Sequence, residues 1–346
     1  MATQDSSSII GGMFGLELMI NPDGGIPPFV KDRSIFLVNA SSAIWLLVRQ
    51  LSPSHVWIPS YLCHAILESI RRSDRKPNFY EVGEDLAIPS FDWLLKVEKG
   101  DLVLLIDYFG FPCDPEFILA VKERGAWVLE DASQALLTEE VGRFSDFVIY
   151  SLRKHLGIPD GGILNSNCSI DLNSIELSPP PTGWWLKAFT ASVLRREFDQ
   201  FGGSRQWFEL FQMSEAEAPI GAYRMSELSQ TILLNGLDFT WMAERRIDNY
   251  RSLSSLEKVA LIQDLPPGVV PLGFPIRLRN RDRLRQILFA NEIYPPIHWQ
   301  IQGFVPKSFM GSHRLSSEIL TLPCDQRYDS SDMERMSQII LEVIGN

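Results

Sequence analysis

The stretch that decides the fold is Tyr150-Ser-Leu-Arg-Lys-His-Leu-Gly-Ile-Pro-Asp-Gly-Gly162. It begins at the end of an apolar, β-rich run (residues 147–151), and its closing Gly-Gly opens another such run (residues 161–164). Lys154 therefore lies just beyond a predicted strand, in a predicted turn that leads into the next strand. Considered alone, a lysine at the end of a strand is usually a solvated surface residue. Its meaning depends on the segments around it.

Short β-rich runs and helix-like stretches alternate from residue 35 to residue 166. The predicted strands are residues 55–58, 78–82, 102–108, 127–130, 147–151 and 161–164. The predicted helices between them are residues 42–50, 62–73, 92–97 and 115–124. This alternation predicts βαβ units and a mostly parallel sheet. Residues 103–106 are all apolar, as expected of a strand that is covered on both faces.

The pattern changes after about residue 167. Residues 184–201 look helical, whereas residues 202–222 contain Gly-Gly and an acidic stretch and are expected to form a loop. Residues 225–256 are rich in helix formers and predict either one long helix or two. A smaller unit is expected beyond them, with a strand at residues 275–279 and helices at residues 281–291 and 331–344. We expect a large α/β domain over residues 1–236 and a small α+β domain over residues 237–346.

Composition argues against several classes of protein. The 346 residues carry a formal net charge of −11, which disfavours nucleic acids and anionic membrane surfaces as partners. The four cysteines lack the spacing of a metal site, so no metal is expected, and reduced thiols in the cytoplasm fit best. The N-terminus lacks the basic and apolar pattern of a signal peptide, and no apolar run is long enough to cross a bilayer. We therefore expect a cytoplasmic protein that binds neither nucleic acid nor membrane.

Two further segments place useful polar groups near the ends of predicted elements. Residues 130–135 (Glu-Asp-Ala-Ser-Gln-Ala) follow a strand, and a carboxylate there points into the crevice where α/β sheets bind ligands. Residues 39–44 (Asn-Ala-Ser-Ser-Ala-Ile) lead into a helix, whose free N–H groups and dipole can bind an anion. Each segment also has a plainer interpretation, because Asp131 and Ser41 are residue types that commonly cap helices.

The order of these segments favours one cofactor, pyridoxal 5′-phosphate (PLP). A helix start that can bind phosphate comes first, Asp131 comes second, and Ser151 precedes Lys154 by three residues. PLP needs a lysine on a fixed backbone at a cleft for its Schiff base, and hydroxyl and N–H groups for its phosphate. It also needs a carboxylate that keeps the pyridine nitrogen protonated, so that the ring acts as an electron sink. The sequence thus predicts a PLP site with Lys154 as the Schiff-base lysine.

The same segments resemble those of a known family, the DegT/DnrJ/StrS sugar aminotransferases, which are fold-type I PLP-dependent enzymes. Residues 39–44 stand where the family has Ser-Gly-Thr-Ala-Ala-Leu, and residues 130–135 resemble its Glu-Asp-Ala-Ala-Gln. Residues 141–146 (Val-Gly-Arg-Phe-Ser-Asp) resemble its Val-Gly-x-Phe-Gly-Asp. Further similar segments, in the family's order, are residues 58–61, 107–114, 223–228, 244–250 and 322–323.

The resemblance covers roughly residues 35–345. It implies an α/β fold of fold type I: a large domain whose mostly parallel seven-stranded sheet is flanked by helices, and a small C-terminal α+β domain. It also implies a homodimer, because the active sites of this family form across a subunit interface.

The resemblance also assigns roles residue by residue. Lys154 would hold the cofactor and move the proton between the substrate carbon and the cofactor. Asp131 would pair with the pyridine nitrogen, and Gln134 would hydrogen-bond near the phenolic oxygen. The phosphate would be bound through backbone N–H groups and hydroxyls by Ala40, Ser41 and Ser151.

Departures from the family pattern leave alternatives open. Where the family places an aromatic residue that stacks on the cofactor ring, this chain has Cys63 followed by His64. Either His64 or Tyr61 covers the ring, or the stacking is absent. Ala222 stands where a family asparagine contacts the phosphate from the partner subunit. The serine and lysine of the Schiff-base segment are two residues closer than is usual in the family, and they match the spacing of other fold-type I aminotransferases.

Two histidines have alternative interpretations. His155 directly follows the lysine, where it either orients the lysine or is simply exposed. His298 is placed to reach the cleft from the small domain, although a structural role is commoner for a histidine.

The leading hypothesis is a PLP-dependent aminotransferase of sugar or polysaccharide biosynthesis. It would transfer an amino group from glutamate to a keto group of a sugar nucleotide or a related polar metabolite, in a ping-pong cycle. One alternative is a non-transaminating PLP enzyme, such as a lyase or dehydratase. Another is a catalytically silent homologue that acts as a binding or regulatory subunit. Retention of both Lys154 and Asp131 argues against the silent homologue, because a scaffold needs neither.

Overall fold

A seven-stranded sheet forms the centre of the molecule in the computed structural model, which describes residues 9–17, 25–170 and 175–345. The strand order is β2-β8-β7-β6-β5-β3-β4. Of these seven strands, β8 runs in the direction opposite to the other six. The predicted mostly parallel sheet is confirmed. The strands are β2 (Ile35–Leu37), β3 (Val56–Pro59), β4 (Pro77–Tyr80), β5 (Leu102–Ile106), β6 (Trp127–Asp131), β7 (Phe147–Ser151) and β8 (Gly162–Ser166).

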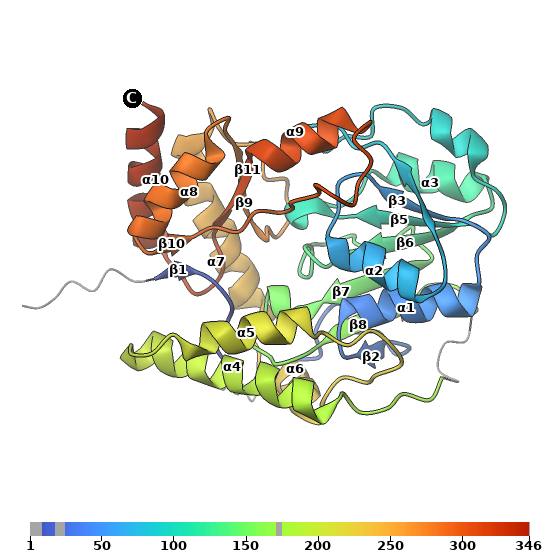
Figure 1. Ribbon diagram of the computed structural model, residues 1–346, viewed down its shortest axis with the longest axis horizontal. Coiled ribbons are helices and arrows are strands. Elements are labelled where there is room, and N and C mark those ends of the chain that lie inside the picture. Colours follow the sequence, from blue (N-terminus) through green and yellow to red (C-terminus); the bar gives the residue numbers. More distant parts are fainter. Residues whose placement is uncertain (1–8, 18–24, 171–174, 346) are drawn as a thin grey trace, which may run out of the picture.

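The helices of this part begin at residues that the sequence marks as caps. Asn39 accepts a hydrogen bond from the Ser42 N–H and starts α1 (Ala40–Leu51). Asp114 does the same for α3 (Pro115–Glu123), with proline at its first position. Between them lies α2 (His64–Arg72), which packs beside α1 (Figure 1). Short 3₁₀ turns complete the connections: η1 (Asp92–Lys96), η2 (Tyr108–Gly110) and η3 (Leu152–Lys154).

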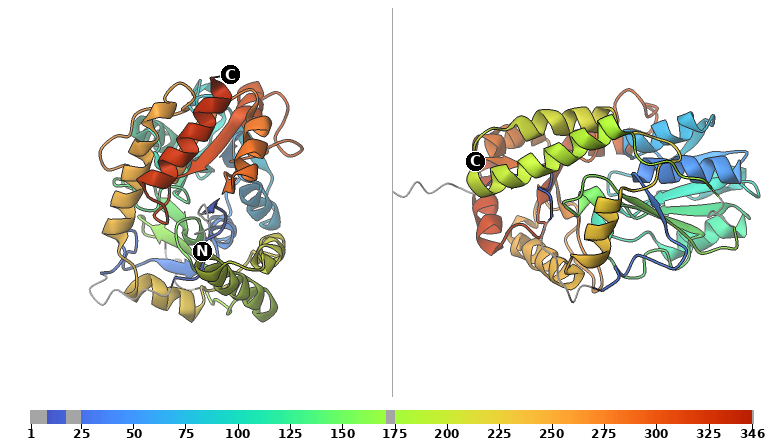
Figure 2. Two further views of the ribbon diagram at one scale, coloured as in Figure 1. Left: turned by 90° about the vertical axis from the view of Figure 1, so that its left-hand side faces the viewer. Right: turned by 90° about the horizontal axis from the view of Figure 1, so that it is seen from below.

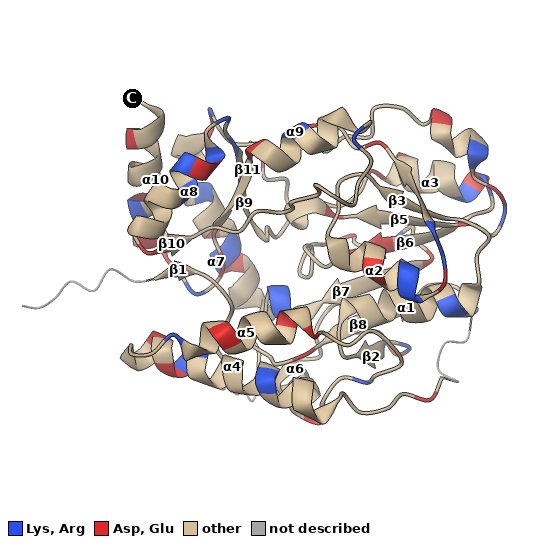
Figure 3. Ribbon diagram, in the orientation of Figure 1, with Lys and Arg blue, Asp and Glu red and all other residues tan. Residues whose placement is uncertain are grey.

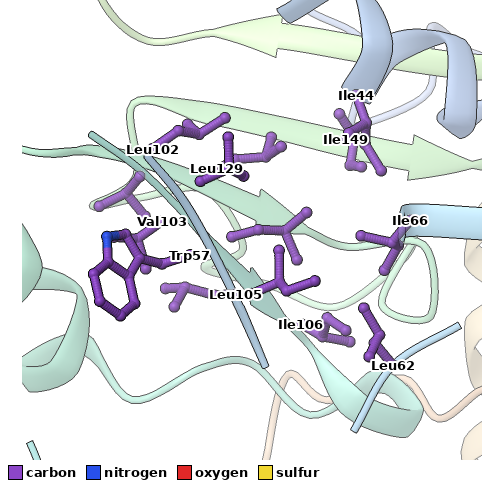
Figure 4. Packing of buried hydrophobic residues seen from close by; sticks show 14 of the residues in the cluster. Ile44, Trp57, Leu62, Ile66, Leu102, Val103, Leu105, Ile106, Leu129 and Ile149 are labelled. Atoms are coloured by element: carbon purple, nitrogen blue, oxygen red, sulfur yellow. The ribbon is translucent and has the colours of Figure 1, made fainter. Parts of the chain in front are cut away.

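The sheet is buried on both faces. All five residues of β5 are buried, and apolar side chains of α1 and α2 converge on it together with those of the neighbouring strands (Figure 4). Along β7, Phe147 and Ile149 belong to this cluster, whereas Val148 and Tyr150 belong to a second cluster on the opposite face. Fully burying one such side chain contributes about 1.5–3 kcal/mol, so the two clusters fix the sheet firmly between its layers.

The C-terminal part forms a smaller α+β unit beside the sheet (Figure 1). In this unit β9 and β11 pair antiparallel, and β1 pairs parallel with β10. Residues 225–256 form two helices followed by a 3₁₀ turn, rather than one long helix. Ile10 of β1 packs in the core of this unit. The domain boundary at residue 236 stays a prediction. The helix α6 (Glu227–Asn235) packs its Leu233 in the second cluster of the sheet. The elements that follow it or pair with the smaller unit are β1 (Ile10–Gly11), α7 (Phe239–Ser252), η4 (Ser254–Leu256), β9 (Gly273–Arg277), α8 (Arg281–Ala290), β10 (Ile293–Tyr294), α9 (Met310–Glu318), β11 (Ile319–Pro323) and α10 (Ser330–Ile344).

The expectation of a loop over residues 202–222 is wrong. A helix, α5 (Gln206–Ala216), folds back on α4 (Thr182–Phe201) after a turn at the two glycines, and the two helices lie side by side (Figure 2). Trp184 donates from Nε1 to the carbonyl of Ser214 at 2.8 Å. Glu215, from the acidic stretch that indicated a loop, pairs with Arg153 at 2.6 Å. Packing and ion pairing between distant segments thus stabilise a helix that local composition disfavours.

Charged residues lie mainly on the helices and loops, and the central strands carry few (Figure 3). Within the described residues, no helix combines the length and apolar character needed to span a membrane. The same residues contain no cluster of three or more histidine, cysteine or acidic side chains that could hold a metal ion.

Candidate active site

The N-terminus of α1 lies against the ends of β7 and β8. Gly162 opens β8 and pairs with both Ser151 and Leu37. A Cβ atom on Gly162 would lie 2.5 Å from the backbone nitrogen of Ala40, closer than any side chain tolerates. Glycine at this position therefore lets the helix start approach the strand ends. This close approach brings together the three residues predicted to bind phosphate. Ala40 and Ser41 lie at the helix start beside Gly162, and Ser151 of β7 is paired with Gly162 of β8.

The first turn of α1 offers free hydrogen-bond donors. The Asn39 side chain accepts from the Ser42 N–H at 2.8 Å, and the Asn39 carbonyl accepts from the Ala43 N–H at 3.3 Å. The N–H groups of Ala40 and Ser41 have no such partner among the described residues. Free N–H groups and the positive end of the helix dipole stabilise a bound anion.

Asp131 and Gln134 lie at the end of β6, next to the strand that leads to the lysine. Asp131 is paired in register with Ile149 of β7, and its buried carboxylate accepts a hydrogen bond from the Ser133 N–H at 3.0 Å. Gln134 is buried, and its Oε1 accepts from the Phe109 N–H at 2.7 Å. Its Nε2 has no partner among the described residues, so the free side of this amide is a donor that suits a ligand oxygen.

Lys154 stands at the end of η3, directly after β7. Its Nζ atom lies 5.8 Å from the centroid of the Trp299 ring, which comes from the C-terminal part of the chain. Burial raises the pKa of the Cys63 thiol, the charge of Lys154 opposes this rise, and the charge of Asp131 adds to it. Cys63 is therefore near enough to Lys154 and Asp131 for both charges to act on its thiol.

The two residues predicted to cover the cofactor ring have different surroundings. Tyr61 is fully buried, its hydroxyl donates to the carbonyl of His298, and its ring centroid lies 5.6 Å from that of Trp299. His64 is exposed as the first residue of α2, and its ring meets the edge of Phe304 at 5.0 Å between centroids. Which of them covers the ring stays a prediction.

The C-terminal part contributes residues that the sequence did not place at the site. Trp299 is one of them, and no spacing pattern connects it with Lys154. The neighbouring His298 lies 3.0 Å from the Thr321 hydroxyl, measured from Nδ1. Burial lowers the pKa of His298 to about 3, and the positive charge of Lys154 acts in the same direction. We call this pair, His298 and Trp299, the aromatic wall of the site; it is uncharged near neutral pH.

The residues around Lys154 fit PLP. The first turn of α1 suits its phosphate, Asp131 suits its pyridine nitrogen, the free amide donor of Gln134 suits its phenolic oxygen, and the lysine amine suits its aldehyde. Ala222 adds no polar side chain, and its carbonyl accepts from the Ser178 N–H at 2.9 Å.

The model of the DegT/DnrJ/EryC1/StrS aminotransferase family matches residues 30–341. The chain belongs to this family. The predictions of the family, of a fold-type I architecture and of a PLP-dependent aminotransferase are thereby confirmed.

Solved structures of other aminotransferases share the fold. A DegT/DnrJ/EryC1/StrS aminotransferase from Brucella abortus is 20% identical with a TM-score of 0.64, over 90% of this chain and 86% of that one. DesV from S. venezuelae, in complex with a ketimine intermediate, is 16% identical with a TM-score of 0.65 over 91% and 86%. PseC from Helicobacter pylori, involved in the biosynthesis of pseudoaminic acid, is 16% identical with a TM-score of 0.66 over 89% and 86%. No match was found among curated proteins.

Proposed function

We propose that this aminotransferase transfers an amino group from glutamate to a keto group of a sugar nucleotide or a related polar metabolite. The observation that carries the proposal is the set of free polar groups around Lys154: the donors of α1, the Asp131 carboxylate and the Gln134 amide. The aromatic, uncharged wall formed with Trp299 suits the apolar face of a sugar ring. The involvement of PseC in the biosynthesis of pseudoaminic acid supports the same substrate class.

Each proposed site residue would have a defined role. Lys154 would bind the cofactor aldehyde and would carry a proton to and from the substrate carbon. Asp131 would accept a hydrogen bond from the protonated pyridine nitrogen and keep that proton in place. Gln134 would donate to the phenolic oxygen. Bound PLP would supply an electron sink for the substrate carbon. Ala40, Ser41 and Ser151 would hold the phosphate, and Tyr61 or His64 would cover the ring face.

We also propose a cytoplasmic homodimer. The α4–α5 hairpin carries apolar side chains that are roughly half exposed, and burial against a second copy would remove this surface from water. They include Leu186 (50% exposed), Phe208 (46%) and Met213 (46%). Sedimentation of the purified protein tests this, and a monomer at micromolar concentration would contradict it.

The activity is tested in two steps. Purified protein incubated with PLP should show the visible absorption of protein-bound PLP, and borohydride should attach the cofactor covalently to Lys154. Protein that takes up no PLP would contradict the proposal. In a separate sample without borohydride, glutamate should convert the bound cofactor to the pyridoxamine form, with release of the keto acid. A lyase or dehydratase would leave the spectrum of bound PLP in place instead, which separates the second hypothesis from the first.

A further inference from the structure

We infer that Arg246 and Gln326 are positioning residues for the cofactor, because they join the backbone beside Lys154 to the side chain of Gln134 through one buried chain of hydrogen bonds. The inference rests on the proposed PLP site. Neither residue touches the predicted cofactor-binding side chains, and both belong to the C-terminal part of the chain, Arg246 on α7 and Gln326 in the loop after β11.

The first arm of this chain ends beside Lys154. Arg246 donates from Nε to the side-chain oxygen of Gln326 at 2.9 Å, and Gln326 donates from Nε2 to the carbonyl of His155 at 2.7 Å. All three residues are buried. The amide of Gln326 accepts at one end and donates at the other, so a carboxylate of the same size cannot make both bonds.

The second arm ends at Gln134. Arg246 donates from Nη1 to the carbonyls of Pro271 and Leu272, each at 3.2 Å. The Leu272 N–H donates to the carbonyl of Phe109 at 2.9 Å, and the Phe109 N–H donates to Oε1 of Gln134 at 2.7 Å. One guanidinium group therefore sets the positions of both Lys154 and Gln134.

The loop that holds Gln326 is itself fixed to α7. Asn249, one turn beyond Arg246, donates from Nδ2 to the carbonyls of Asp325 and Tyr328, each at 3.0 Å. Arg327 pairs with the Asp325 carboxylate at 2.8 Å. Gln326 is thus anchored on both sides, and its amide has little freedom to leave the chain of hydrogen bonds.

The second arm is equally tight where it passes η2. Phe109 adopts a positive φ of 57°, and the following Gly110 lies so close to Val270 that an added Cβ atom would be 2.4 Å from its carbonyl oxygen. Thr138 also donates to the carbonyl of Gly110 at 2.7 Å. A shift of the segment around Pro271 would therefore also displace Phe109 and, through its N–H group, the side-chain amide of Gln134.

Charge distinguishes this arrangement from ordinary packing. Arg246 is fully buried and forms no ion pair with a described residue, and burial lowers its pKa. Burial also lowers the pKa of His155 well below its ordinary value, with the charges of Arg246 and Lys154 adding to the effect, so its ring is neutral. The charges of Asp325 and Glu17 oppose the lowering of the Arg246 pKa without forming an ion pair with it. A buried cation without a carboxylate in direct contact is costly, and a neutral side chain would fill the same space with less loss of hydration. The fixed fork of the guanidinium group explains why an arginine stands here.

The reach of the two arms matches the chemistry of the cofactor. The aldehyde carbon and the phenolic oxygen of PLP are substituents of neighbouring ring carbons, and Lys154 and Gln134 are proposed to contact one each. A chain of hydrogen bonds that fixes both contacts keeps the lysine amine and the amide donor at matching positions on the ring.

The test compares Gln326→Glu, which keeps the size and removes the donor to His155, with Gln338→Glu, the same change at an exposed position on α10. We expect Gln326→Glu to raise the Kd for PLP about tenfold, the effect of one lost buried hydrogen bond. We also expect it to shift the pH midpoint of the visible absorption change of bound PLP. Gln338→Glu should leave both values at those of the wild type.

Folding is checked by the melting temperature without PLP. If Gln326→Glu does not fold, Gln326→Met, which has similar volume and no hydrogen-bonding group, takes its place. Unchanged Kd and pH midpoint in a folded variant, with PLP bound normally by the wild type, would overturn this inference alone. A wild-type protein that binds no PLP would overturn the proposed function together with it.

Discussion

The two sides of the candidate site are built in different ways. The sheet side, with Ser41, Asp131 and Lys154, is formed by strand ends and a helix start that lie close together because of the sheet topology. The opposite side, with Trp299 and His298, comes from a segment that reaches the cleft only through the packing of the C-terminal part. The first side therefore carries the free polar groups for a cofactor, and the second supplies an aromatic wall. The expected effects of substitution should differ accordingly.

The largest effect is expected on the sheet side, from Lys154→Ala. Loss of a positioned proton carrier typically costs about 10²–10⁴-fold in rate, so the conversion of bound PLP by glutamate should slow by at least that factor. Stopped-flow absorbance measures the rate. Lys187→Ala, which removes a surface lysine paired with Glu217, is the control and should be unaffected. If Lys154→Ala and Lys187→Ala reacted at equal rates, the proposed role of Lys154 would be contradicted.

Asp131→Asn should have the next largest effect. A buried hydrogen bond to a charged group contributes about 1.5–3 kcal/mol, so the same rate should fall roughly 10- to 150-fold. The pyridine nitrogen would lose the carboxylate that keeps it protonated, whereas the shape of the site would hardly change. Asp114→Asn, in which asparagine also serves as a helix cap, provides the matched control. No helix directly follows Asp131, so a rate like that of the wild type would show that its carboxylate serves only the turn after β6, through the Ser133 N–H.

Gly162→Ala should damage the sheet side through the backbone alone. The added methyl group would meet the backbone of Asn39 and Ala40 at 2.3–2.6 Å, and such overpacking costs about 1–3 kcal/mol. We expect a lower free energy of unfolding in urea and weaker PLP binding, because the start of α1 must move. Gly183→Ala, in open space on α4, should instead be neutral or slightly stabilising. If Gly162→Ala bound PLP as tightly as the wild type, the start of α1 would not be the phosphate-binding site.

The last prediction concerns pH and the opposite side, where no effect on activity at neutral pH is expected. The pKa of His298 in the folded protein is about 3, below the ordinary value of 6.5, so its neutral form favours folding above pH 6.5. This contribution is lost as the pH falls from 6.5 towards 3, at up to about 1.4 kcal/mol per pH unit. The free energy of unfolding should therefore fall more steeply between pH 6.5 and 4.5 in the wild type than in His298→Asn. His64→Asn, at an exposed position, should keep the wild-type slope.

The difference between the two sides also explains what could be predicted from the sequence. Local patterns located six of the seven sheet strands and gave no range for the short edge strand β2. They also predicted Asp131 and Lys154 as site residues, because a strand end is both a local feature and a point where topology gathers side chains. Trp299 could not be found in this way, since its place beside Lys154 depends on packing between distant segments. The helix α5 was missed for the same reason, because contacts with distant segments stabilise it. Arg153 pairs with Glu215 near its acidic end, and the guanidinium of Arg195 lies 4.5 Å from the ring centroid of Trp207.

The pairing of β1 with β10 has a consequence for the order in which the protein folds. Ile10 is fully buried in the same cluster as Met333 and Ile340, and the Gly11 N–H donates to the Tyr328 hydroxyl at 2.6 Å. A chain emerging from the ribosome presents its first strand long before these partners exist. The early α/β segments can pack while synthesis continues, but the small core must wait for its last helix. Until then β1 lacks the side chains against which Ile10 packs.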